Sequence, residues 1–200
     1  MAFPFLTIFV TFVIFLAIRY RSIANRRAKR MNDYWNREAQ ANNAPAKDLS
    51  ALPYLQIPEG LLPYGCLDDP DVTSIENAIQ EIAKKPMLNL NGKDNAEIKL
   101  LYGAANFDYM VSVGENFDQL QMLLVDYAKA LMQHERYIEA TTVLEYGVFI
   151  GSDISSNYTL LGDCYQIRRM LDKIPELKGR LEQRHLLLEP SIMNYLDALD

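Results

Sequence analysis

The sequence predicts an all-α protein in which one apolar N-terminal helix precedes a helical domain. Three observations lead to this fold class. The first 18 residues contain no charged side chain, apolar residues recur at intervals of three and four over most of residues 73–199, and no segment alternates as a strand would. Half of the 200 residues are hydrophobic, so the chain can bury a core and wholesale disorder is excluded.

Residues 1–18 have the length and composition of a transmembrane helix. Eighteen residues rise about 27 Å in a helix, close to the roughly 30 Å hydrocarbon core of a bilayer. A cleaved signal peptide would carry cations before its apolar run and small residues after it. Here Arg19-Tyr20-Arg21 follows the run directly. We therefore expect a membrane anchor rather than a signal peptide or a soluble core helix.

Charge is distributed unevenly along the chain. Residues 1–38 carry a net charge of +5, whereas the total is −6, so residues 39–200 carry −11. Cations at the end of a span stay in the cytoplasm, which predicts an outside N-terminus and a cytoplasmic C-terminal domain. The simplest host is a bacterial plasma membrane, with a eukaryotic organelle membrane left open. Setting this topology is the main expected role of the basic cluster, and contact with anionic lipid or a partner is a second. The cluster comprises Arg19, Arg21, Arg26, Arg27, Lys29 and Arg30.

A connector is expected between the anchor and the domain. Residues 19–50 form a basic juxtamembrane segment and linker, of which 22–40 could continue as helix because its residues favour helix. Residues 51–70 contain four prolines, which exclude a continuous helix. Their apolar content predicts an extended segment packed on the helical domain. A docking strip for another protein is the alternative.

The helical domain is expected over residues 71–200. Thr73 to Glu76 resembles a capping box, Asp94 can cap the next helix and Gly114 is expected to end it. Gly151 breaks a later helix, and Pro175 is expected in the first turn of another. The predicted helices are 73–85, 94–113, 117–133, 137–150, 155–169, 172–187 and 190–199.

An internal repeat with a spacing of 34 residues is visible in the sequence. Its first members are Leu124, Tyr127, Ala128 and Leu131, matched by Tyr158, Leu161, Gly162 and Tyr165. After the first set come an aromatic residue, a small one, a bulky one and a second small one, at Tyr137, Ala140, Leu144 and Gly147. The segment around 121–165 thus resembles a tetratricopeptide repeat. Glu135 and Ser152 stand where that family usually has Gly and Pro.

The resemblance implies antiparallel helix pairs stacked as an α-solenoid, with the first helix of each pair lining a concave peptide-binding surface. Only Lys129 among the matching positions is cationic, so a mixed polar and apolar strip is implied rather than a clamp for a peptide carboxylate. The candidate groove residues are Met122, Val125, Lys129, Met132, Gln133, Thr159, Asp163 and Gln166.

Catalysis, metal binding and nucleic-acid binding receive no support from the sequence. The two Cys lie 98 positions apart and there are only two His, so a Cys/His zinc site is not expected. His134 and His185 are read as solvated or capping residues. The acidic average disfavours nucleic acid. Gly60 and Gly65 lack the Lys-Ser/Thr of a phosphate loop. We expect no enzyme activity, cofactor or metal.

Three functions follow from these features. The first is a membrane-anchored adaptor or scaffold that binds a protein or peptide through a cytoplasmic tetratricopeptide-like domain. The second is a structural subunit of a larger membrane complex, with the domain packed against its neighbours. The third is an enzyme whose helical active site the sequence does not reveal.

Overall fold

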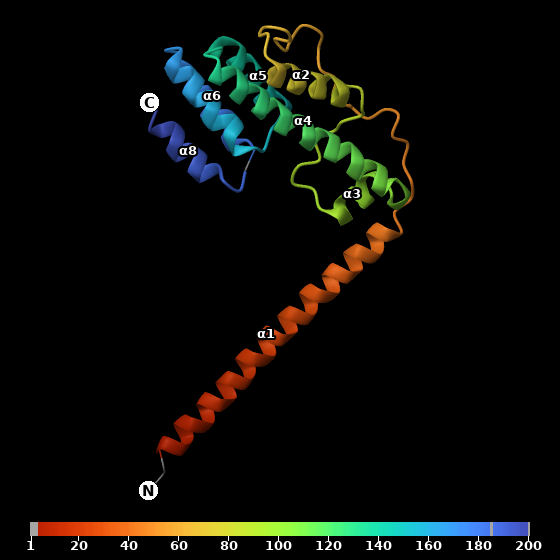
Figure 1. The fold of residues 1–200 in the computed structure, drawn as a ribbon. Coiled ribbons are helices and arrows are strands. Elements are labelled where there is room, and N and C mark those ends of the chain that lie inside the picture. The colour runs from red at the N-terminus through yellow and green to blue at the C-terminus, as the bar shows by residue number, and fades with distance from the viewer. Residues whose placement is uncertain (1–3, 185, 200) are drawn as a thin grey trace. The chain divides into compact units, whose positions relative to one another are not determined.

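The computed structural model describes residues 4–184 and 186–199, and all regular structure in these residues is helical (Figure 1). The prediction of an all-α protein is therefore confirmed for the described part of the chain. The chain divides into two compact units. One contains residues 4–49 and 93–107, and the other contains residues 50–92 and 108–199.

The first unit is built on α1 (Pro4–Asn42), drawn in red to orange in Figure 1. From Ile8 onward it is long and apolar enough to cross a membrane, and its most apolar stretch is not buried by the rest of the chain. The helix continues past residue 18 without interruption, which confirms the expected helix over 22–40. Asn43 donates its side-chain amide to the carbonyl of Ala39 at 2.7 Å, and Pro45 prevents any continuation.

A short helix, α3 (Asn95–Tyr102), packs on the C-terminal end of α1. Arg37 donates both terminal nitrogens to the carboxylate of Asp94, at 2.7 and 3.1 Å, and Lys99 donates to Asn42 at 2.7 Å. Asp94 also accepts the N–H of Glu97 at 2.8 Å, which confirms it as the helix cap. This backbone bond, and then Arg37, hold the pKa of Asp94 below its ordinary value.

The helix end that was expected at Gly114 lies at Gly103 instead. The expected helix 94–113 instead ends at Gly103, whose φ of 96° lies in the glycine region and where an added Cβ would meet Pro45 O at 2.4 Å. After η1 (Ala104–Asn106), α4 runs from Phe107 to Gln133 without a break. The expected stop at Gly114 is wrong, because this glycine lies within α4 against the side chain of Leu90.

The second unit contains α2 (Pro70–Ala83), α4, α5 (Tyr137–Ile150), α6 (Ser155–Ile167), η2 (Leu171–Lys173), α7 (Ile174–Glu182) and α8 (Glu189–Asp197). The start of α2 differs from the predicted capping box at Thr73. Asp69 caps it instead by accepting the N–H groups of Asp71 and Val72, and Pro70 occupies the first turn. Pro70 can open a helix because it lacks an N–H that would stay unpaired there.

The boundaries of α5, α6 and α8 agree with the predicted ones to within two residues, whereas α7 ends at Glu182, five residues before the predicted end at 187. The bounds of α5 are those predicted, and Gly151 follows in the left-handed conformation. Pro175 lies in the first turn of α7, as expected. Gly147 of α5 lies so close to the side chain of Asn157 in α6 that an added Cβ would meet its Oδ1 at 2.1 Å. A small residue is thus needed where α5 and α6 cross, although a tetratricopeptide-like solenoid stays a prediction.

The proline-rich segment packs against the core of the second unit. Leu62 is buried, and Leu55, Ile57, Tyr64 and Leu67 pack against the buried cluster formed by α2 and α4–α8. The expectation of an extended segment that packs on the helical domain is confirmed. Burial of these side chains explains how a segment without regular structure holds a fixed path.

Candidate functional site

The predicted concave surface is only partly open to a ligand. Met122, Lys129 and Gln133 lie exposed on α4, and Lys129 pairs with Asp126 at 3.2 Å. Met132 is half-buried against the core. Val125, expected to be exposed, is only 3 % accessible and is therefore corrected to a core residue.

The C-terminal region packs on the α6 part of the predicted concave surface. An added Cβ at Gly162 would meet Leu196 and Leu199 of the C-terminal region at 2.7 and 2.8 Å, and Tyr195 donates its hydroxyl to Asp163 at 2.6 Å. Asp163 and Thr159 are accordingly half-buried, while Gln166 stays exposed. The spacing of Ile192, Leu196 and Leu199 gave a signal that α8 would cover a neighbouring helix, but not which one.

A different concavity lies between α5, α6, α7 and the proline-rich segment. It has a volume of about 450 Å³ and an apolar lining that includes Tyr146, Val148, Leu161 and Leu177. We call it the α5–α7 groove. None of its lining residues belongs to the eight groove residues predicted from the sequence. Sequence reasoning missed it because it depends on residues 58 and 61 packing beside helices some 80 to 120 positions later.

Phe149 is the most prominent side chain of the groove. It is 71 % exposed, although its neighbours Val148 and Ile150 are buried. Its ring stacks on that of Tyr146, with centroids 6.3 Å apart and planes at 25°. Because α5 is apolar on nearly every side, the face that the core does not cover still presents an aromatic ring to solvent.

Tyr146 contributes a buried polar atom to this site. The residue is 4 % exposed, and its hydroxyl has no hydrogen-bond partner among the described residues. An unsatisfied buried hydroxyl costs about 1–3 kcal/mol. Burial, and secondarily the proximity of Tyr64, raises the pKa of Tyr146 to about 12. The phenol therefore stays neutral at physiological pH.

Charged groups of both signs border the apolar part of the groove. Tyr165 donates its hydroxyl to Glu145 at 2.8 Å, and burial together with this carboxylate raises the pKa of Tyr165 well above its ordinary value. Arg180 pairs with Glu176 at 2.7 Å. Lys173 has no ion-pair partner among the described residues. It is therefore the cation available to a ligand.

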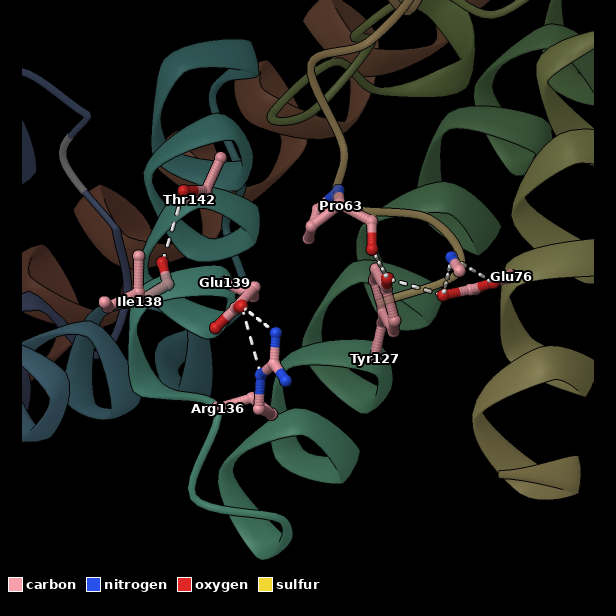
Figure 2. A network of polar contacts seen from close by, with 8 residues as sticks. Pro63, Glu76, Tyr127, Arg136, Ile138, Glu139 and Thr142 are labelled. Atoms are coloured by element: carbon pink, nitrogen blue, oxygen red, sulfur yellow. Dashed lines mark hydrogen bonds and ion pairs between the residues drawn. The ribbon is translucent and has the colours of Figure 1, made fainter. Parts of the chain in front are cut away.

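A buried polar network fixes the proline-rich wall of the groove (Figure 2). Glu76 of α2 is 6 % exposed, and each of its oxygens accepts the N–H of Gly65 at 3.0 Å. Tyr127 of α4 shares its one hydroxyl proton between Glu76 at 2.7 Å and the carbonyl of Pro63 at 2.9 Å. Burial, then Glu76, raises the pKa of Tyr127 far above its ordinary value. Two helices thus hold residues 63–65 from both sides, a few positions after Pro58 and Leu61 of the groove.

A second polar contact set orders the start of α5 (Figure 2). Arg136 forms an ion pair with Glu139, and Thr142 donates its hydroxyl to the carbonyl of Ile138 at 3.2 Å. Thr142 also lines the α5–α7 groove. Because its proton is used within the helix, Thr142 can offer the groove only an acceptor oxygen.

Catalytic or metal-binding geometry is not apparent in the described residues. No group of three or more His, Cys, Asp and Glu side chains lies together there in a way that could hold a metal ion. His134 lies 3.5 Å from Asp69 at the surface, and His185 falls outside the described residues. Cys164 is buried, and burial raises the pKa of its thiol to about 11. The absence of enzyme activity stays a prediction.

The basic cluster of residues 19–30 lies on the exposed part of α1. Its six cationic side chains are exposed along about three helical turns beyond the apolar run. No family model, curated protein or solved structure matches this chain. The candidate sites therefore rest on the geometry of the chain itself.

Proposed function

We propose that this chain is a membrane-anchored protein-binding module, and that its α5–α7 groove receives an extended peptide segment of another protein. The observation that carries the proposal is Phe149, an aromatic ring that is 71 % exposed at the mouth of a 450 Å³ apolar groove. Buried aromatic anchors dominate the energetics of protein interfaces, and an exposed ring beside a hollow can become one on binding.

The groove chemistry indicates the kind of segment that fits. A bulky apolar side chain would fill the space between Phe149, Leu61 and Leu177. Lys173, which has no ion pair among the described residues, favours a carboxylate next to that side chain. The proposal also includes the fold: α4 pairs with α5, and α6 with α7, as in tetratricopeptide repeats.

The anchor and the charge pattern complete the proposal. An apolar helix followed by six cations within residues 19–30 favours a single-pass protein with its helical domain in the cytoplasm, for which a bacterial plasma membrane is the simplest setting. Anchoring would confine the groove to the membrane surface and raise the local concentration of a membrane-associated partner.

The test compares two exposed apolar residues of the same helix. Phe149 lines the groove, whereas Ile138, 65 % exposed, does not. A photoreactive amino acid at each position in the full-length chain, irradiated in its own membranes, should give a discrete protein adduct at 149 only. Phe149→Ala should abolish co-purification of that partner, and Ile138→Ala should preserve it.

Other outcomes would contradict binding at the α5–α7 groove or favour a different function. Equal adducts at 138 and 149, or an effect of Lys129→Ala with Gln133→Ala but none of Phe149→Ala, would overturn the α5–α7 groove. Recovery of the chain only in one large stoichiometric complex would favour a structural subunit. Blue native electrophoresis of solubilised membranes separates that case from a transient adaptor.

A further inference from the structure

The juxtamembrane half of α1 carries apolar side chains that α3, its neighbour in the first unit, does not cover. Met31 is 56 % and Trp35 is 61 % exposed. The ion pair between Arg37 and Asp94 attaches α3 to the opposite face of the helix, since residues 35 and 37 point about 200° apart. Trp35 lies about 25 Å beyond the apolar run and contacts the ring of Tyr34 edge-on at 5.3 Å, so aromatic surface continues well past the length that a membrane needs.

Met31 and Trp35 lie on one exposed face of α1 that follows a heptad pattern. Seven residues make nearly two helical turns, so a pattern of alternating three- and four-residue steps stays on one face. Starting at Val10, this face carries small or apolar residues at every position except one. Its members are Val10, Ile14, Ala17, Arg21, Ala24, Ala28, Met31 and Trp35. We call this face the α1 seam.

We propose that the α1 seam pairs with the same seam of a second copy of this chain, forming a parallel, in-register helix dimer from the membrane to Trp35. All copies share one orientation in the membrane, so two such helices can only meet in parallel. Ala17, Ala24 and Ala28 let the two backbones approach closely, and Ala17 does so within the lipid, where small residues favour helix association. The pairing does not depend on the α5–α7 groove.

The charges of α1 are arranged in a way that permits this pairing. The cations other than Arg21 and Arg27 occupy outer heptad positions that point away from a second helix. They are Arg19, Arg26, Lys29, Arg30 and Arg37. Arg27 flanks the seam and would face Asn32 of the second copy, a neutral amide. No like charges therefore oppose each other across the flanks of the dimer.

Arg21 is the exception within the seam, and its position explains it. It lies one turn beyond the apolar run, at the level of the lipid headgroups. A long arginine side chain can extend its guanidinium sideways to phosphate while its methylenes stay along the helix. The seam therefore tolerates a cation at this level more readily than at residues 24–35.

The continuity of α1 argues against the helix lying flat on the bilayer surface. Flat binding would require a sharp bend near residue 20, and such kinks occur mainly at Pro or Gly. The sequence has neither between residues 5 and 44, and α1 is one uninterrupted helix through this stretch. The apolar side chains near Trp35 are consequently held away from lipid, where a second seam can reach them.

Disulfide crosslinking of the full-length chain in its native membranes tests the proposal. Cys66→Ser removes the half-buried thiol, while Cys164 is retained because it is fully buried and its pKa is raised to about 11. Single cysteines are then placed in the seam (Ala24→Cys, Ala28→Cys, Met31→Cys) or opposite it (Arg26→Cys, Asp33→Cys). Mild oxidation should give several-fold more disulfide dimer at each seam position than at either outer position.

A pair of charge insertions provides an independent measurement. In cells that express two differently tagged full-length copies, Ala28→Arg should remove their co-purification, because it adds a pair of facing cations to the seam beyond the headgroup level at which Arg21 lies. Ile23→Arg adds the same charge at an outer position and should leave co-purification unchanged. Dimer yields that are equal at all cysteine positions, largest at residues 26 and 33, or absent throughout would overturn the proposal. So would equal effects of the two arginine substitutions.

Discussion

Replacement of Glu76 by alanine should destabilise the second unit and loosen one wall of the groove. The carboxylate is 6 % exposed and binds Gly65 N–H at 3.0 Å and Tyr127 O–H at 2.7 Å. After Glu76→Ala, Tyr127 keeps the Pro63 carbonyl at 2.9 Å, but Gly65 N–H loses its acceptor. Residues 63–65 would then be attached to α2 through apolar contacts alone.

The magnitude follows from these contacts. A hydrogen bond to a charged group contributes about 1.5–3 kcal/mol, and two groups lose the same acceptor. The partial exposure of Gly65 lets water replace part of that loss. We expect a decrease of about 2–4 kcal/mol in the free energy of unfolding, or roughly 5–15 °C in Tm for a unit of this size.

Far-UV circular dichroism of the full-length chain in detergent is the appropriate assay. Tryptophan fluorescence would report on the wrong unit, because the single Trp of the sequence is Trp35 in α1. Glu81→Ala is the matched control, since Glu81 lies on the same helix with a side chain that is 71 % exposed, and it should change stability by at most about 0.5 kcal/mol. Equal stabilities of Glu76→Ala and Glu81→Ala would refute the structural role of the network.

Three further predictions test the packing and the titration of the second unit. Gly147→Ala should lower the free energy of unfolding by about 1–3 kcal/mol, because the added methyl displaces buried Asn157. This loss exceeds the gain in helix propensity. A variant that is more stable in urea unfolding would contradict the close crossing of α5 and α6. Leu196→Ala should cost about 2–5 kcal/mol because the residue is fully buried in α8, and limited proteolysis should then cleave near residue 188 first. Burial raises the pKa of Tyr64 and of Tyr146 from 10.0 to about 12. Their contribution to folding stability should therefore be constant below pH 10 and be lost between pH 10 and 12, visible as a lower Tm at pH 11 than at pH 9.

The agreement between sequence and structure is closest where local chemistry decides. Asp94 caps α3 through its own side chain, and Gly151 ends α5 by adopting a left-handed conformation. Pro175 can occupy only the first turn of a helix without breaking it. Each of these outcomes depends on a few consecutive residues, so the sequence was sufficient to predict it.

The predictions fail where contacts with a segment distant in the sequence determine a helix end or the burial of a side chain. Gly103 and Gly114 are equally able to end a helix, but Pro45 approaches the first and Leu90 packs on the second. Val125 carries the spacing of an exposed groove residue, yet the core covers it. No local pattern distinguishes these alternatives, because the neighbours that select between them lie 24 or more positions away.

The sequence by itself determined that this protein is helical, that its first helix is apolar enough to cross a membrane, and that cations follow that helix. These properties are sums over neighbouring residues, and helix periodicity and charge are already present in the linear order. Only the tertiary structure decided which helix faces remain open. Glu76 and Tyr127 hold the proline-rich segment beside α5 and α7, and α8 packs on α6. The exposed ring of Phe149 is the surface of α5 that this long-range packing leaves uncovered.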